Sequence, residues 1–246
     1  MADRASLFKY AVKALGTSHN IMPCFMAKPI EGLPGNSGHM HISLLDPTTN
    51  KNVFARATQN PNPTFPGLEY VSDIGEQFLA GILDGLPAVM PILAPTINSY
   101  KRLVENFWAP VTVSWGLEHR AASIRLISPP TVPAKATRFE IRTCGADANP
   151  HYVLAAILGC GLRGVARKMK LTIPPLGKGE AGTGDGERLA KNLGEAVGKF
   201  SAEGSVAREV FGDGFVEHFA GTRLHEIQLW EQAVTDWEVK RYIETV

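Results

Sequence analysis

The sequence predicts an α+β protein with a mainly antiparallel sheet and helices packed on one side of it. Two observations support this prediction. Strand-like runs occur in groups that long helical segments separate, and the 24 glycines and 17 prolines indicate many turns between short elements. The chain has 246 residues, and a chain of this length buries roughly 70–75% of its unfolded surface, so a substantial core is expected.

The first third of the chain is predicted to contain two helices and two strands. Apolar residues at the start share one helical face, and Gly16 is a suitable residue to end that helix. The segment 29–38 is too rich in glycine and proline for regular structure. In order, the predicted elements are a helix at 6–15, strands at 21–27 and 39–45, an exposed loop at 46–67 and a helix at 68–86.

The rest of the chain is predicted to be strands followed by helices. Alternation of apolar and polar residues is clearest in the third of these strands. Asn149 is a good N-cap and Pro150 suits the first turn of a helix. The predicted elements are strands at 111–115, 122–127 and 137–143, a helix from Asn149 to about Met169, a loop through 183–186, and a helical last third that ends in a helix from Leu224 to about Tyr242.

Composition excludes several classes of protein. Hydrophobic residues make up 44% and charged residues 20% of the chain, which is typical of a globular protein. The 25 Lys and Arg nearly balance 24 Asp and Glu, so no nucleic-acid or membrane-surface partner is expected. The most apolar stretch, 81–97, is interrupted by Asp84 and three prolines and is not expected to span a membrane. No secretory signal is evident, so we expect a cytoplasmic protein.

Common cofactor and metal motifs are missing from the sequence. Cys24, Cys144 and Cys160 are far apart and lack C-x-x-C spacing, which favours neither a disulfide framework nor a thiolate metal site. Neither G-x-x-x-x-G-K-[ST] nor G-x-G-x-x-G occurs, so a P-loop or a Rossmann-type cofactor site is not supported.

The segment 39–43 is the first candidate for chemistry. On a strand, His39, His41 and Ser43 share one face, while Met40 and Ile42 lie on the other. Two imidazoles and a hydroxyl beside a glycine-rich turn suit metal or phosphate binding. The alternative is a half-buried strand whose polar residues are satisfied within the protein.

The segment 138–142 repeats this pattern. Arg138, Glu140 and Arg142 share one face, and the carboxylate of Glu140 should stay ionised between two guanidinium groups. Glu140 could then bind a hard metal ion beside arginines that hold phosphate or carboxylate. The alternative is a solvated strand face with ion pairs.

Five arginines lie at or near predicted strand ends although the net charge is only +1, so positive charge is concentrated locally. Arginine forks favour polyanions such as nucleotide phosphates or dicarboxylates, and a polyanion with a hard metal indicates phosphoryl transfer. Only one acid, Glu140, lies within the cluster, so other metal ligands converge from distant loops or lie outside this chain. The arginines are Arg102, Arg120, Arg125, Arg138 and Arg142.

Several motifs in register resemble those of one family. They are Gly-Asn-Ser-Gly-His-Met-His-Ile-Ser at 35–43, Asn-Ser-Tyr-Lys-Arg-Leu-Val at 98–104, the block 109–125, and Arg-Phe-Glu-Ile-Arg at 138–142 with Ala-Asn-Pro at 148–150. In order and spacing the chain resembles glutamine synthetase, with similarity to the class I-related synthetases of fungi. The resemblance is strong from the first helix to about residue 170 and looser beyond.

The resemblance implies a glutamine synthetase catalytic-domain fold, an antiparallel half-barrel with helices packed outside. Residues 1–246 then form the C-terminal part of that domain, and the family's N-terminal β-domain and first catalytic strands, which carry most metal-binding carboxylates, are absent. The expected reaction is ATP-dependent condensation of glutamate with ammonia through γ-glutamyl phosphate, with Mg²⁺ or Mn²⁺. Expected partners are these small molecules and, in the full-length protein, further copies of the chain in stacked rings with sites between subunits.

The resemblance also implies roles for individual residues. Metal ligands would be His39 and Glu140. ATP contacts would be His41, Ser43, Arg125, Lys135 and Arg138. Glutamate would bind at Gly35, Arg102, Arg120 and Arg142, of which Arg120 and Arg142 are the expected catalytic residues that steady the transferring phosphoryl group.

Two departures from the family pattern open alternatives. Trp108 stands where the family has a flap glutamate that helps to deprotonate ammonium, and Glu105 lies three residues away. An indole cannot accept a proton but can hold a cation by its π face, so a γ-glutamyl ligase for a larger amine is an alternative. A non-catalytic relative is another, although retention of His39, Glu140 and the five arginines argues against it. The glycine-rich loop also reads Gly35-Asn36-Ser37-Gly38, where Asn-Gly-Ser-Gly is usual.

Overall fold

The computed structural model describes residues 1–105, 109–177, 179–180 and 186–246. Within them lies a four-stranded sheet of order β1-β4-β3-β2. The β1/β4 and β3/β4 pairs are antiparallel, and the β2/β3 pair is parallel. The prediction of a mainly antiparallel sheet is therefore confirmed. The strands are β1 (Met40–Ile42), β2 (Trp115–Leu117), β3 (Ile124–Ile127) and β4 (Arg138–Ile141).

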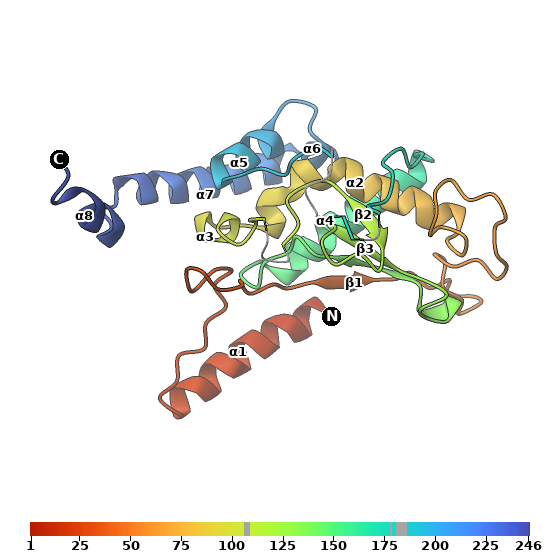
Figure 1. Cartoon of the computed structure of the whole chain (residues 1–246), viewed down its shortest axis with the longest axis horizontal. Helices are drawn as coiled ribbons and strands as arrows, with labels where there is room; N and C mark the ends of the chain where they lie inside the picture. The colour runs from red at the N-terminus through yellow and green to blue at the C-terminus, as the bar shows by residue number, and fades with distance from the viewer. Residues whose placement is uncertain (106–108, 178, 181–185) are drawn as a thin grey trace.

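Helices supply most of the remaining regular structure (Figure 1). The central helix α2 packs against α4, α5 and α6. Helix α1 contacts α4 and lies at the lower edge of the molecule in Figure 1. The helices are α1 (Ala2–Ser18), α2 (Asp73–Leu93), α3 (Ile97–Tyr100), α4 (Pro150–Ala166), α5 (Leu193–Ser201), α6 (Val206–Phe211), α7 (Asp213–Gln232) and α8 (Asp236–Tyr242), with a 3₁₀ turn η1 (Ala134–Ala136) before β4.

The two faces of the sheet differ in polarity, and this difference positions the site. One face carries apolar residues that alternate along the strands and join α2 in the core. Phe139 of β4 stacks with Phe78 of α2, and Phe54 packs against both rings. The other face carries the charged residues of β1, β3 and β4. Period-2 alternation therefore separates the core from the charged face, as the sequence predicts.

Helices α2 and α4 approach closely at glycines. A Cβ at Gly81 would lie 2.3 Å from the carbonyl oxygen of Cys160 and 2.7 Å from the Cα of Gly164. The N-terminus of α4 is as predicted, because the Asn149 side chain accepts hydrogen bonds from the backbone N–H groups of His151 and Tyr152 and Pro150 occupies the first turn.

Five predicted elements differ from the structure. The loop 46–67 is not exposed throughout, because Phe54 is 0% and Asn52 8% exposed and Phe54 joins the core. Residues 21–27 are not a strand, because no neighbouring strand pairs with them among the described residues. The predicted strand 111–115 forms only a short antiparallel bridge with 187–189, and β2 begins at Trp115. Helix α2 continues past Leu86 through two prolines, since burial on several sides outweighs the lost hydrogen bonds. The last predicted helix is interrupted at 233–235, where Thr235 caps α8.

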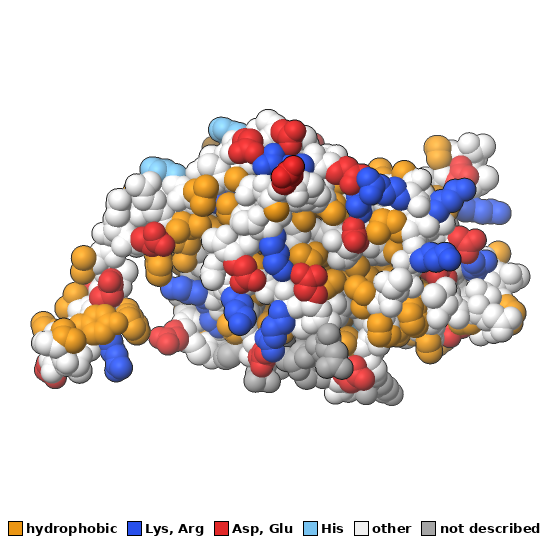
Figure 2. Space-filling model, turned by 90° about the horizontal axis from the view of Figure 1, so that it is seen from above, with side chains coloured by type: hydrophobic (Ala, Val, Ile, Leu, Met, Phe, Trp, Pro, Cys, Tyr) orange, Lys and Arg blue, Asp and Glu red, His pale blue; other side chains and the backbone are white. Residues whose placement is uncertain are grey.

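Of the described helices, α2 alone is long and apolar enough to cross a membrane by length and composition. Most of it is buried within the protein, as expected of a central core helix. Figure 2 shows lysine and arginine interspersed with aspartate and glutamate over the face that carries α5 to α7, and hydrophobic side chains gathered on the C-terminal arm. Exposed apolar residues of that arm are Val234, Trp237, Val239, Tyr242 and Ile243.

Candidate functional site

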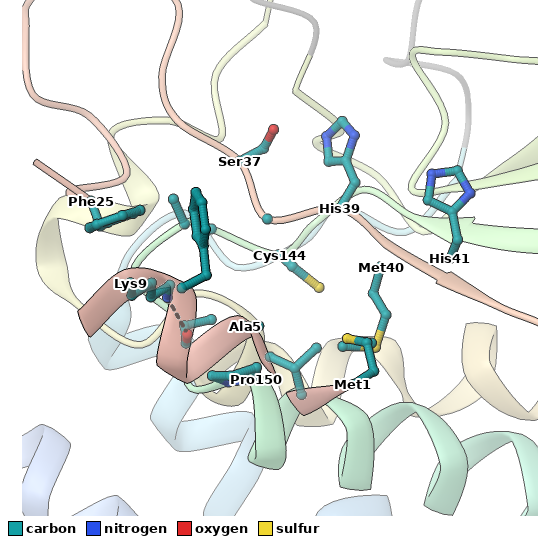
Figure 3. A pocket seen from close by; sticks show the side chains of 16 residues that line it. Met1, Ala5, Lys9, Phe25, Ser37, His39, Met40, His41, Cys144 and Pro150 are labelled. Carbon is teal, nitrogen blue, oxygen red and sulfur yellow. Dashed lines mark hydrogen bonds between the residues drawn. The ribbon is translucent and has the colours of Figure 1, made fainter. Parts of the chain in front are cut away.

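His41 of β1 and His39, which directly precedes the strand, lie on the charged face of the sheet. Figure 3 shows His39 and His41 on one side of the strand, while Met40 lies on the other side with Cys144 and Met1. Met40 is 6% exposed and belongs to the core. The predicted alternation of this segment is therefore correct, and it places both imidazoles beside the neighbouring strand β4.

Strand register brings three of the predicted site residues into line. His41 of β1 lies opposite Glu140 of β4, and Glu140 lies opposite Arg125 of β3. Directly opposed residues in adjacent strands have side chains close enough to interact. The three side chains are thus neighbours across the charged face, although 99 residues separate His41 from Glu140 in the chain.

Glu140 is the centre of this face, and we call Glu140 with His39, Arg125 and Arg142 the Glu140 cluster. Its Oε1 accepts a hydrogen bond from Nη1 of Arg142 at 2.6 Å and lies 2.9 Å from Nδ1 of His39. Its Oε2 accepts from Nη1 of Arg125 at 3.0 Å. The Glu140 side chain is only 4% exposed, so the solvated strand face considered above is wrong, whereas the ion pairs are present.

Electrostatics fix the charge states in the Glu140 cluster. Burial opposes ionisation of Glu140, but the positive charges of Arg142 and Arg125 lower the pKa of its carboxyl below the ordinary value. Burial, aided by the charge of Arg142, lowers the pKa of His39 to about 4. His39 is therefore neutral at neutral pH. Its proton belongs on Nδ1, which faces the carboxylate, and this leaves the lone pair on Nε2.

His41 takes the opposite tautomer. The Nε of Arg138 donates to Nδ1 of His41 at 3.2 Å, so that nitrogen is an acceptor. Burial lowers the pKa of His41, with the charge of Arg138 acting in the same direction. A neutral His41 then carries its proton on Nε2, and this N–H can donate a hydrogen bond. The two histidines of one strand face thus offer a ligand different atoms, a lone pair from His39 and an N–H from His41.

Arg102 lies beside this face at the glycine-rich loop. A Cβ at Gly35 would meet the Cγ of Arg102 at 2.7 Å, so only glycine allows the loop to approach this side chain. Arg102 is 4% exposed and donates from Nη2 to the carbonyl of Thr143. Within the described part of the chain, the buried Nε atoms of Arg102 and Arg142 have no hydrogen-bond partner. Both guanidinium groups therefore keep a donor unused.

Three other predicted residues are exposed and lie outside the Glu140 cluster. Arg120 is exposed, and its charge acts on the pKa of Arg142. Ser43 is exposed just after β1, and Lys135 is exposed in η1. Trp108, which suggested a larger amine as an alternative to ammonia, lies outside the described residues. Glu105 is described, and its Oε1 accepts a hydrogen bond from Nη2 of Arg188 at 2.6 Å.

Glu118 belongs to the site although the sequence analysis did not include it. Its carboxylate accepts from Nε of Arg125 at 2.9 Å and from the Thr131 hydroxyl at 2.7 Å. It therefore orients the guanidinium that also reaches Glu140. Glu118 has φ of 53° just after β2, so no strand alternation marks it in the sequence. With Glu118 included, the five arginines outnumber the nearby carboxylates, which are Glu118, Glu140 and, beside Arg102, Asp147.

His39 and Glu140 match the ligands of a divalent ion in kind but not in number. Magnesium takes about six ligands, mainly oxygen. In the described portion of the chain, no group of three or more His, Cys, Asp or Glu could hold a metal ion. The carboxylate of Glu140 is also engaged by two arginines. These residues do not form a metal site by themselves.

The motifs and the charged sheet face agree with a family comparison. The model of the family described as glutamine synthetase, catalytic domain, matches residues 1–242. The chain belongs to the glutamine synthetase family. A solved structure titled GmaS/ADP complex has the same fold, with a TM-score of 0.78 and 28% sequence identity. The superposition covers 99% of this chain and 54% of that one. The predicted catalytic-domain fold is confirmed.

Relatives in the glutamine synthetase family carry two kinds of name. Type-1 glutamine synthetase 2 of Dictyostelium discoideum is 41% identical over all of this chain and 45% of its own length. Glutamate–isopropylamine ligase of a Pseudomonas species is 39% identical over all of this chain and 51% of its own length. The chain thus spans about half the length of the curated relatives it matches.

Proposed function

We propose that this chain supplies the arginine-rich part of the active site of an ATP-dependent glutamate ligase. The observation that carries the proposal is the surplus of guanidinium groups around the Glu140 cluster, on one face of a sheet whose other face is core. Two anionic substrates, ATP and glutamate, would meet complementary charge there.

The proposed division of the face follows from the atoms each residue offers. Arg138 and Arg125, with the N–H of His41, would hold ATP phosphates, with Ser43 and Lys135 at the margin. Arg102 beside Gly35 would hold a carboxylate of glutamate. Arg142 and Arg120 would lie against the group that transfers, where positive charge stabilises the phosphoryl oxygens.

The chemistry then proceeds in two displacements. A γ-carboxylate oxygen of glutamate attacks the γ-phosphorus of ATP, the bond to ADP breaks and γ-glutamyl phosphate forms. The nitrogen of ammonia or an amine attacks the acyl carbon, phosphate leaves and the nitrogen loses a proton. The arginines act in the first displacement by neutralising charge and by positioning the two reactants.

A divalent ion, Mg²⁺ or Mn²⁺, would supply charge neutralisation on the ATP phosphates when bound. We propose that His39, through its Nε2 lone pair, and Glu140 contribute to holding it, and that the remaining ligands come from outside the described residues.

A second candidate differs only in the nucleophile. One relative is named glutamate–isopropylamine ligase, which supports an alkylamine as the nucleophile. Trp108 at the family's flap-glutamate position supports the same candidate. The pairing of Glu105 with Arg188 leaves that carboxylate engaged elsewhere. The residues that bind ATP and glutamate are common to both candidates.

Turnover tests the proposal and separates the two nucleophiles. The 246-residue chain would be co-expressed with the part of the Dictyostelium relative that it does not match, and the co-purified complex assayed for phosphate release. We expect release that requires ATP, glutamate and an amine, and none from the 246-residue chain alone because two metal ligands are too few. Higher rates with isopropylamine than with ammonia support the second candidate, and glutamine formation by the chain alone contradicts the account.

We also propose that the protein assembles with further copies of itself. The C-terminal arm supports this, because its apolar side chains are largely exposed (Figure 2), with Trp237 64% and Val234 82% exposed. Light scattering after gel filtration is expected to give a mass above the 26.6 kDa of one chain. Trp237→Glu should lower that mass, and an unchanged monomer mass for both proteins would contradict the proposal.

A further inference from the structure

A buried asparagine joins the chain that follows β1 to the chain that precedes β4. Asn52 is 8% exposed, and residues 44–53 fold back on themselves, with Leu45 and Asn52 forming an antiparallel bridge. The backbone N–H of Val53 donates to the carbonyl of Leu44 at 2.8 Å in the same turn. This turn places the Asn52 side chain beside η1, although 83 residues separate Asn52 from its first partner there.

The Asn52 amide has three backbone partners. Its Nδ2 donates to the carbonyls of Lys135 at 3.2 Å and of Thr137 at 2.6 Å. Its Oδ1 accepts from the N–H of Phe54 at 3.0 Å. Phe54 is 0% exposed and packs against Phe139 of β4. The amide therefore ties the 3₁₀ turn η1 to a residue that the core holds in place.

The two carbonyls that Asn52 binds flank the carbonyl that holds Arg138. The carbonyl of Ala136, which lies between them in the chain, accepts from Nη1 of Arg138 at 2.9 Å. Nε of the same guanidinium donates to Nδ1 of His41 at 3.2 Å. The position of Arg138 thus depends on the orientation of the peptide that carries the Ala136 carbonyl, and Asn52 fixes the peptides on both sides of it.

We propose that Asn52 is a positioning residue for ATP, which through η1 holds Lys135 and Arg138 where they meet the phosphates. The inference rests on the function proposed above, which assigns ATP phosphates to these two cations. Asn52 acts through them, because it is buried and both hydrogens of its amide are engaged within the chain. A phosphate-binding side chain is effective when its own support is fixed, so loss of the amide donors should weaken phosphate binding.

The side-chain N–H signal of Arg138 tests the position of its guanidinium without ATP. Asn52→Asp keeps the shape of the side chain, but a carboxylate has no hydrogen to donate to the two backbone carbonyls. In heteronuclear NMR, the Nε–H signal of Arg138, assigned by its absence from Arg138→Ala, is expected to shift and to exchange with water about fivefold faster or more. The Nε–H of Arg125, which Glu118 accepts, should stay unchanged. An unchanged Arg138 signal in the folded variant would overturn the proposal.

Displacement of a fluorescent ATP analogue tests the consequence for binding. Asn52→Asp and the uncharged Asn52→Ser, whose shorter side chain loses at least one donor, are expected to weaken ATP binding about fivefold or more.

The control is Asn192→Ala, which removes a comparable hydrogen bond from the Glu195 N–H at the start of α5 and should leave affinity unchanged. Circular dichroism confirms that each variant is folded. Unchanged affinity in both folded Asn52 variants, or an equal loss in the control, contradicts the proposal. No saturable binding by the unaltered chain contradicts the proposed function, whereas a failure of the positioning alone is seen as an unchanged Arg138 signal.

Discussion

Glu140 shows how a single buried carboxylate organises this site. It contacts His39, Arg125 and Arg142, which come from three separate segments of the chain. Its charge is what allows two guanidinium groups to be held close together in a poorly solvated place. Removing one member of a buried ion network leaves the others uncompensated, which costs more than the pair itself contributes.

Glu140→Gln is therefore expected to lower the free energy of unfolding by about 3 kcal/mol, since Arg142 loses its carboxylate partner and Arg125 keeps only Glu118. Urea denaturation followed by circular dichroism measures the change. The matched control is Glu217→Gln, whose carboxylate pairs with Arg208 and is 65% exposed, and for which a change below about 1 kcal/mol is expected. Equal losses in the two variants would show that Glu140 does not hold the cluster together.

Much of the site at this scale can be predicted from the sequence, because strand alternation has a fixed period. His39 with His41, and Arg138 with Glu140 and Arg142, share faces as predicted. Glu118 could not be found in this way, since it lies in a turn and reaches Arg125 only through the fold.

At the scale of elements, the start of α4 agrees with the prediction, whereas α2 begins at Asp73 and not at Leu68. Asn149 and Pro150 act within one turn of α4, so the sequence contains the whole signal. A strand needs a partner, and the run 21–27 has the residues of a strand without a neighbour in the described part of the chain. The end of α2 was placed too early, because burial of Pro91 within the core depends on contacts that local sequence does not show.

The close approach of α2 and α4 predicts a strong effect of one methyl group. In Gly81→Ala the new Cβ would meet backbone atoms of Cys160 and Gly164, which cannot move aside as a side chain would. A loss of about 3 kcal/mol in the free energy of unfolding is expected. Gly198→Ala in α5 is the control, because nothing lies within 4 Å of its Cβ position, and it should stabilise by about 0.5–1 kcal/mol. Similar effects of both changes would contradict this packing.

The whole molecule has a net charge close to zero, but the face of the sheet that carries the Glu140 cluster is positively charged. The 25 basic and 24 acidic residues give +1, and over the face in Figure 2 the two signs are mixed. Around the Glu140 cluster, arginine outnumbers carboxylate. An anion with several charges can supply the missing counter-charge, and for a ligase of this family ATP is the expected source.

ATP binding by the 246-residue chain tests this central claim most directly. Displacement of a fluorescent ATP analogue would be measured for the unaltered chain, for Arg138→Ala and for Arg167→Ala, which removes an exposed arginine paired with Glu209 at the end of α4. The account predicts weak but saturable binding of ATP by the unaltered chain. The affinity should fall about tenfold or more in Arg138→Ala, because one charge-assisted contact is lost, and should stay unchanged in Arg167→Ala. Equal affinity of all three proteins, or no saturable binding, would contradict it.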